Sequence, residues 1–140
     1  MSTDELVREV LEKYRSVAVY GMSKNPEKAA HSVPAYLLSR GFTVFPINPS
    51  AEEILGLKCY NTVGEVEGNI DILDVFRPAN EATAIVEEAV ERKGSRGDVA
   101  VIWLQEGIIN DEAKHLAEEA DITFVQDRCI YKELRRLESP

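Results

Sequence analysis

Five short apolar runs are spaced along the sequence, and their pattern constrains the fold more than any other feature. Residues 16–20 read SVAVY, residues 70–76 read IDILDVF and residues 99–104 read VAVIWL, and two further runs of this kind cover residues 43–47 and 122–125. Their apolar residues are nearly continuous instead of alternating with polar ones, which is typical of strands buried on both faces of a parallel sheet. We therefore expect five buried strands.

Helical patterns separate these strands. Apolar residues recur at helical spacing in several segments, and the segments that read as helices are 5–14, 33–40, 81–93, 110–120 and 130–137. Strands that alternate with helices in this way predict covering layers on both faces of the sheet.

Particular residues near the ends of the predicted helices indicate where each helix starts or stops. Pro34 is expected in the first turn of its helix, with Gly41 as the stop. Asn80 and Asn110 are the expected helix caps. Residues 54–60 follow two prolines and predict at most a short helix and a weak edge segment.

The predicted fold class is α/β: a Rossmann-like, three-layer α/β/α arrangement with a doubly wound, mainly parallel sheet of about five strands. The chain has 140 residues, the usual size of one domain, so residues 1–140 are expected to form a single domain. In such sheets ligands bind beyond the carboxyl ends of the strands, near the point where the strand order reverses. The candidate binding loops are those that follow Tyr20, Ile47, Phe76, Leu104 and Val125.

The composition of the chain limits the kinds of molecule that we expect it to bind. A formal net charge of -9 argues against nucleic acid, although local amides and a few cations can still hold one phosphorylated cofactor. The start of the chain does not read as a leader, and no apolar stretch approaches the ~20 residues that cross a bilayer, so we expect a cytoplasmic protein without a membrane partner. Cys59 and Cys129 are too few for a disulfide framework or a metal cage, and reduced thiols are expected.

The loop after residue 20 has the chemistry of a phosphate site. Gly21 permits a tight turn, two lysines bring positive charge, and the next helix is expected to offer unpaired amides from about His31 to Val33. The full G-x-G-x-x-G fingerprint is absent, so a merely solvated loop is the alternative. The candidate binding residues here are Gly21, Met22, Ser23, Lys24, Lys28, His31, Ser32 and Val33.

The loop after residue 47 differs from that of a dehydrogenase. Asn48 and Pro49 stand where a Rossmann dehydrogenase usually places an acid that holds the ribose hydroxyls. The amide of Asn48 can donate a hydrogen bond and would not repel a ribose phosphate. The alternative is that Asn48 merely starts a proline turn.

Five motifs in matching order carry a family resemblance. They are VAVYGMS at residues 17–23, PINP at 46–49, DILDVFR at 71–77, WLQEG at 103–107 and DRC at 127–129. With these motifs, the chain resembles the small bacterial and archaeal CoA-binding protein family and the nucleotide-binding half of the succinyl-CoA synthetase alpha subunit.

The resemblance implies a coenzyme A site. Gly21, Ser23, Lys24 and the helix start at Ser32 would surround the phosphates, and the turn at Asn48 and Pro49 would lie near the nucleotide. The remaining implied residues are Phe76, Arg77 and Pro78 on the next wall, Gln105 and Gly107 near the pantetheine arm, and Cys129, where the synthetase subunit also has a cysteine. The synthetase's phosphorylated histidine lies in a second domain, which this chain does not match.

The leading functional prediction is therefore a non-catalytic protein that binds coenzyme A or an acyl-CoA for storage, delivery or sensing, because no catalytic constellation is evident. The alternatives are a CoA-dependent ligase or transferase subunit completed by a separate chain, and an NAD(P)-binding oxidoreductase. A lesser option is thiol protection through a mixed disulfide between Cys129 and CoA, against a buried, inert cysteine. The expected protein partner is a second copy of the chain or an acyl-CoA synthetase subunit.

Overall fold

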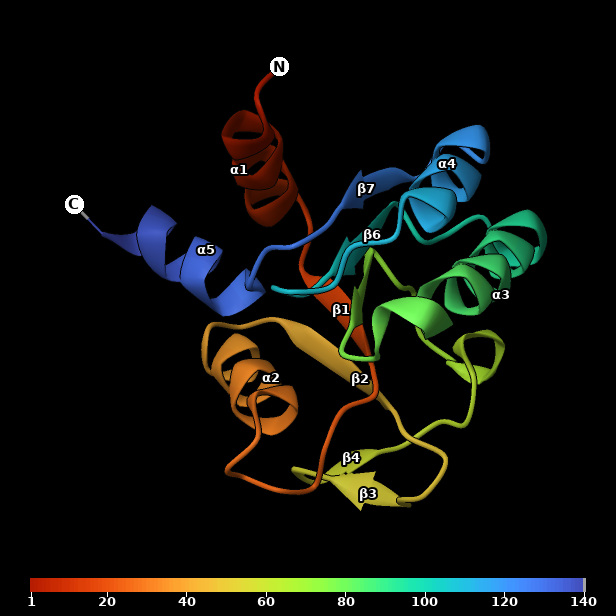
Figure 1. Ribbon diagram of the computed structural model, residues 1–140. Coiled ribbons are helices and arrows are strands. Elements are labelled where there is room, and N and C mark those ends of the chain that lie inside the picture. The colour runs from red at the N-terminus through yellow and green to blue at the C-terminus, as the bar shows by residue number, and fades with distance from the viewer. Residues whose placement is uncertain (140) are drawn as a thin grey trace.

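A five-stranded parallel sheet forms the centre of the protein (Figure 1). The computed structural model describes residues 1–139. The strands are β1 Ser16–Tyr20, β2 Thr43–Ile47, β5 Ile72–Val75, β6 Val101–Leu104 and β7 Thr123–Val125. Their order in the sheet is β2-β1-β5-β6-β7, with every neighbouring pair parallel. This confirms the predicted doubly wound Rossmann-like sheet, whose order reverses between β1 and β5.

Helices cover both faces of the sheet (Figure 1). The helices on one face are α1 Thr3–Lys13, α2 Ala29–Ser39 and α5 Ile130–Glu138. The elements on the other face are α3 Ala82–Arg96, α4 Asp111–Glu119 and the short 3-10 turns Val63–Glu65 and Ala79–Glu81. Each face buries its own apolar core, which explains why the strands carry continuous apolar runs. None of the helices within residues 1–139 combines the length and apolar composition needed to cross a membrane.

Asp74 lies in the central strand β5 and is fully buried. Its register partners on either side are Val19 of β1 and Trp103 of β6. Neither carboxyl oxygen has a hydrogen-bond partner among residues 1–139. Burial therefore raises the pKa of Asp74 well above its ordinary value, and the side chain favours its neutral form.

Residues 54–60 contain no helix, and the predicted weak edge segment has its counterpart in Tyr60, which makes a parallel bridge with Ile47 of the edge strand β2. Two short antiparallel strands, β3 Glu53–Ile54 and β4 Leu57–Lys58, make a hairpin outside the main sheet. Both residues of its turn have left-handed backbone, with φ of 53° at Leu55 and 75° at Gly56. Two-residue hairpins favour such turns, but a leucine at a positive φ gives no sequence signal.

Helix α2 begins earlier than predicted, at residue 29 instead of 33. Pro34 consequently lies inside the helix and not in its first turn. A proline has no N–H, so the carbonyl of Ala30, four residues earlier, receives no bond from it. That carbonyl accepts a hydrogen bond of 3.0 Å from the backbone N–H of Ser23 instead. The proline thus frees a helix carbonyl that holds the preceding loop.

The two predicted asparagine caps have different outcomes. Asn110 caps α4 as predicted, because its side chain accepts from the N–H of Ala113 at 2.9 Å. Asn80 does not cap α3: it lies within a 3-10 turn, and Glu81 takes the cap position without a side-chain bond. The Asn110 side chain also donates to the carbonyl of Ala79 at 2.9 Å and so fastens this turn to the start of α4.

Candidate functional site

The loops after β1 and β5 meet at the point where the strand order reverses. Gly21 ends β1 with a φ of 87°. A Cβ atom at this position would lie 2.8 Å from Cδ of Arg77 and 3.0 Å from the carbonyl oxygen of Phe76. Both the left-handed backbone and the close approach therefore require a glycine. Parallel sheets of this type bind ligands at such a crossing.

A first cleft of about 580 Å³ opens at this crossing. The loops after β1, β2 and β5 form its walls, as the strand order predicts. The lining residues that the sequence singled out are Gly21, Met22, Ser23, Lys28, Asn48, Pro49, Phe76 and Arg77. The cleft therefore brings together residues from three separate loops.

The start of α2 supplies backbone donors to this region, although not the ones expected. The N–H groups of His31 and Ser32 both bond to the carbonyl of Lys28, and that of Val33 lies inside the helix. The backbone N–H groups of Ala29 and Ala30 have no partner among residues 1–139. Ala30 and the cap residue Lys28 line the first cleft. Free amides beside a lysine can bind a phosphate group.

Asn48 joins two of the loops. Its Nδ2 donates to the carbonyl of Met22 at 2.8 Å, and its Oδ1 accepts from the N–H of Ser50 at 2.8 Å. The second bond makes a local turn at Pro49, as the simpler interpretation predicted. The first bond holds the β1 loop against the β2 loop, a role that the sequence did not reveal. One N–H of the amide stays available to a ligand.

Arg77 lies between two clefts and is held by an acid. Its Nε and Nη2 atoms donate to the two carboxylate oxygens of Glu81 at 3.0 and 2.8 Å. These hydrogen bonds hold the pKa of Glu81 below its usual range. Both side chains are partly exposed, at 45% and 41%, so solvent weakens the pair. An incoming phosphate can therefore compete with Glu81 for the guanidinium.

Tyr20 forms part of the first cleft and stays uncharged. Its hydroxyl donates to Oε2 of Glu88 at 2.8 Å. Burial and this hydrogen bond raise the pKa of Tyr20 to about 12. The residue therefore contributes a neutral aromatic wall.

A second cleft, of about 420 Å³, adjoins the first and shares Phe76 and Arg77 with it. Its lining residues are Ala29, Phe76, Arg77, Pro78, Gln105, Glu106, Ile108 and Cys129. Gln105 is only 6% exposed, and its Oε1 accepts from the N–H of Ile130 at 3.1 Å. Cys129 is half-buried with a free thiol. The structure thus places Gln105 and Cys129 at the same cleft.

The remaining predicted residues lie outside both clefts. Lys24 and Ser32 are exposed, and Val33 packs in the core. His31 donates from Nδ1 to the carbonyl of Ser23 at 2.7 Å, which fixes the ring against the loop. Gly107 follows the second cleft with a φ of 86°, and its N–H donates to Asp127.

Several lining residues were missed by sequence reasoning. Glu81 could have been found, because an acid four residues after Arg77 commonly pairs with it. Ala29, Ala30 and Ile108 carry no sequence signal, since their placement depends on where α2 begins and how the β6 loop folds. No group of three His, Cys, Asp or Glu side chains within residues 1–139 could hold a metal ion.

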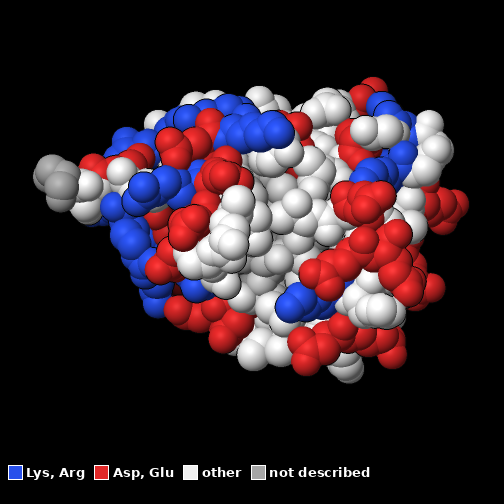
Figure 2. All heavy atoms as spheres, turned by 90° about the horizontal axis from the view of Figure 1, so that it is seen from above, with Lys and Arg blue, Asp and Glu red and all other residues white. Residues whose placement is uncertain are grey.

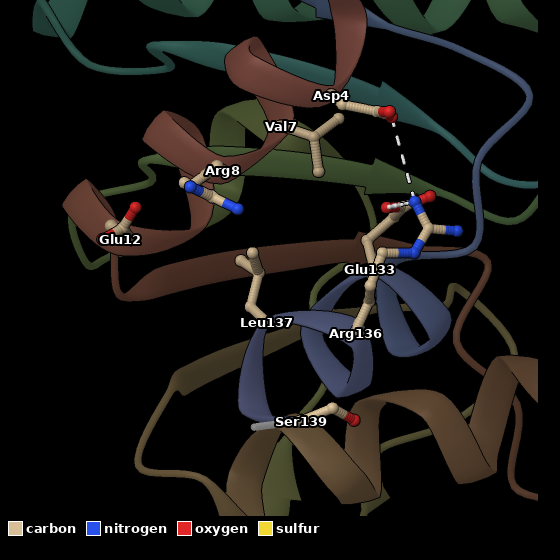
Figure 3. Close-up of a pocket in the computed structure, with 8 residues that line it drawn as sticks. All are labelled: Asp4, Val7, Arg8, Glu12, Glu133, Arg136, Leu137 and Ser139. Atoms are coloured by element: carbon tan, nitrogen blue, oxygen red, sulfur yellow. Dashed lines mark ion pairs between the residues drawn. The ribbon is translucent and has the colours of Figure 1, made fainter.

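A third cleft, of about 480 Å³, lies between α1 and α5 (Figure 3). Glu133 of α5 is buried and pairs with Arg136 at 3.1 Å and with Arg128 at 3.2 Å. Arg128 also pairs with Asp4 of α1 at 2.7 Å. On the face seen in Figure 2, Lys and Arg gather around the end of α5, and Asp and Glu prevail on the opposite side. These ion pairs fasten the first helix to the last one.

Comparisons with known proteins identify a family and several relatives of this chain. Residues 15–135 match the family described as CoA binding domain. The Bacillus subtilis (strain 168) protein YneT is 33% identical over 124 residues, which cover 89% of this chain and 88% of that protein. A solved structure of a hypothetical protein from Pyrococcus horikoshii OT3 is 38% identical, with a TM-score of 0.90 over 99% of this chain and 94% of the other.

A longer relative is an enzyme subunit. The alpha subunit of acetate–CoA ligase [ADP-forming] II from Pyrococcus furiosus is 32% identical over 106 residues. The match covers 75% of this chain but only 23% of that subunit. The chain therefore corresponds to less than a quarter of the ligase subunit's length.

Proposed function

The chain belongs to the CoA binding domain family, and from its two adjoining clefts we propose that it binds coenzyme A, or an acyl-CoA, across the carboxyl ends of β1, β2 and β5. The phosphates lie in the first cleft, beside Lys28 and the free amide of Ala30. The arm of the ligand passes over Phe76 and Arg77 into the second cleft. The observation that carries this proposal is the pair of clefts joined at the crossing point of the sheet.

The end of β2 supports coenzyme A over NAD. A dehydrogenase would place a carboxylate there for the two ribose hydroxyls. Asn48 brings no negative charge, so a phosphorylated ribose can approach it. A ligand with a phosphate on its ribose therefore fits this position, and NAD, which has none, is expected to bind more weakly than coenzyme A.

We further propose that the chain holds this ligand without converting it. His31 is engaged with the loop carbonyl of Ser23, and His115 pairs with Glu119 on an exposed helix face, so neither supports a nucleophile in the clefts. The role that remains is storage, delivery or sensing of coenzyme A by a protein of the cytoplasm.

Calorimetry with CoA, acetyl-CoA, NAD and NADP tests the proposal. We expect both CoA species to bind and NAD to bind at least tenfold more weakly. Lys28→Ala should weaken CoA binding about three- to tenfold, since one cation beside the phosphates is lost. Lys114→Ala, on the exposed side of α4, is the matched control and should bind like the wild type. Absence of CoA binding at millimolar concentration would overturn the proposal.

A second candidate is a subunit role, and its support is the similarity to the ligase alpha subunit. In that case a separate chain supplies the rest of the enzyme, and this chain presents coenzyme A to it. Mixing the purified chain with an acyl-CoA ligase subunit that lacks this domain tests the idea. Ligase activity only in the mixture would support it, and a stable pair of two copies without such activity would oppose it.

A further inference from the structure

A side chain that lines the second cleft has one end held by a hydrogen bond and the other end without a partner among residues 1–139. The N–H of Ile130 can only donate, so the side-chain atom of Gln105 that faces it must be the oxygen Oε1. The other atom, Nε2, has no hydrogen-bond partner among residues 1–139. Among residues 1–139, the fully enclosed side-chain nitrogen and oxygen atoms without a hydrogen-bond partner are the two carboxyl oxygens of Asp74, and Gln105 Nε2 is not among them. Gln105 Nε2 is therefore not fully enclosed, and Gln105 is one of the residues that line the second cleft.

A second donor lies at the same cleft. Ala29 is the first residue of α2, a helix of eleven residues, and its backbone N–H has no partner within the described chain. Ala29 lines the second cleft, whereas its neighbour Ala30 lines the first. Two N–H donors thus belong to residues that line the second cleft: Ala29 is exposed, whereas Gln105 is only 6% exposed, and a donor on a buried side chain favours an acceptor oxygen.

The other walls indicate that this acceptor belongs to a neutral group. Phe76, Pro78 and Ile108 are apolar. Both charged lining residues already have partners of opposite charge: Glu106 pairs with Lys132 at 3.0 Å, and Arg77 pairs with Glu81 and also borders the first cleft, where the ligand's phosphates would compete for it. An anion entering the cleft would find no unpaired cation among its lining residues and would approach the carboxylate of Glu106.

We infer that the second cleft is an acyl subsite, in which Gln105 Nε2 donates to the carbonyl oxygen of a neutral acyl thioester. This rests on the proposed function, because the thioester is the end of an acyl-CoA whose phosphates occupy the first cleft. A free thiol is a weak acceptor and leaves the Gln105 donor unused. The protein therefore prefers a small neutral acyl-CoA to free CoA, and also to a dicarboxylic acyl-CoA such as succinyl-CoA.

A matched pair of ligands tests the subsite on the unaltered protein. Acetyl-CoA and S-ethyl-CoA have the same short apolar end, but only the first has a carbonyl. Calorimetry should give acetyl-CoA an affinity about five- to tenfold higher than S-ethyl-CoA, the effect of one hydrogen bond. Succinyl-CoA should bind more weakly than acetyl-CoA. Equal affinities for acetyl-CoA and S-ethyl-CoA, or tighter binding of succinyl-CoA, would overturn the inference.

The variant Gln105→Glu tests whether the preference for acetyl-CoA over S-ethyl-CoA comes from the Gln105 side chain. It keeps an oxygen for the N–H of Ile130 and replaces the free donor with a second oxygen. The preference for acetyl-CoA over S-ethyl-CoA should disappear while CoA still binds. Gln126→Glu, in the loop after β7 and outside the cleft, is the control and should keep the preference.

Two outcomes of this comparison oppose the inference in different ways. If Gln105→Glu weakens CoA, S-ethyl-CoA and acetyl-CoA by the same factor, the donor serves an amide carbonyl of the pantetheine arm, and the acyl subsite is wrong. If no CoA species binds the wild type, the proposed function fails, and the subsite with it. Thermal unfolding of each variant shows whether it folds, and the wild-type ligand pair decides the question if one does not.

Discussion

The Nδ2 atom of Asn48 donates a hydrogen bond of 2.8 Å to the carbonyl oxygen of Met22. This bond joins the loop after β2 to the loop after β1, which lie 26 residues apart in the sequence. Met22 is fully buried, so its carbonyl has little access to water. The first cleft therefore depends on an asparagine that a dehydrogenase would replace with an acid.

Exchange of this amide for a carboxylate should damage both stability and binding. Asn48→Asp keeps the acceptor for Ser50 but turns a donor into an acceptor that faces the Met22 carbonyl. We expect a loss of about 1 to 3 kcal/mol in the free energy of unfolding, together with weaker CoA binding. Urea unfolding and calorimetry measure the two effects. Asn61→Asp, at an exposed position, should change neither by much.

Two glycines with the same φ allow the cost of backbone strain to be measured separately from the cost of steric crowding. Gly21 and Gly41 both have a φ of 87°, but only at Gly21 would a Cβ meet other atoms within 4 Å. Gly41→Ala should cost about 1 kcal/mol, the effect of a left-handed alanine. Gly21→Ala should cost about 2 to 4 kcal/mol, because Arg77 and the Phe76 carbonyl must also move. Equal losses in urea unfolding would contradict the close approach of the two loops.

The buried carboxyl of Asp74 should make stability depend on pH. Its pKa is raised in the folded protein above the ordinary value of 3.8, so the folded state binds the proton more tightly than the unfolded state. This contribution to stability is fully present below pH 3.8 and is lost as the pH rises toward the folded-state pKa.

Asp74→Asn removes the proton that titrates and keeps the shape of the side chain. The variant should be more stable than the wild type at neutral pH, and the difference should shrink as the pH falls toward 3.8. Urea unfolding of both proteins across this range measures it. Subtracting the two curves cancels the other acids, and a difference that does not change with pH would show that Asp74 is not titrating as described.

Cys129 should react with CoA disulfide more readily than Cys59. Its thiolate would attack one sulfur of the disulfide, form a mixed disulfide with CoA and release the other CoA as a thiol. Cys129 lines the second cleft, where the CoA arm is proposed to lie, whereas burial raises the pKa of the Cys59 thiol. Intact-mass analysis should show one CoA adduct, which Cys129→Ser loses and Cys59→Ser keeps. The reverse pattern would place the reactive thiol outside the cleft.

The five strands and their parallel arrangement could be predicted because burial on both faces leaves a continuous apolar run that few other structures require. The start of α2 could not. A proline is usually placed in the first turn of a helix, and only the loop partner of Ala30 makes Pro34 acceptable further along. The hairpin at Leu55 was missed for a similar reason, since its left-handed backbone contradicts the preference of a leucine.

The first cleft followed from a general rule on where ligands bind in doubly wound sheets, so Gly21, Asn48 and Arg77 were found. Individual roles within it depended on side-chain partners. The amides of His31 and Ser32 bond within the helix start, and those of Ala29 and Ala30 are the ones without a partner among residues 1–139. These hydrogen-bond partners depend on how the loop and helix pack in three dimensions, which the spacing of residues in the sequence does not reveal.

The backbone N–H of Ser23 donates to the carbonyl of Ala30, which Pro34 leaves free, and this hydrogen bond has a consequence for affinity. It ties the loop after β1 to α2, so the loop has lost much of its conformational freedom before any ligand arrives. Ordering a flexible loop on binding costs entropy that would otherwise weaken association. At the proposed CoA site, Pro34 should therefore favour affinity by keeping this loop preorganised, and the shape of the site should hardly change on binding.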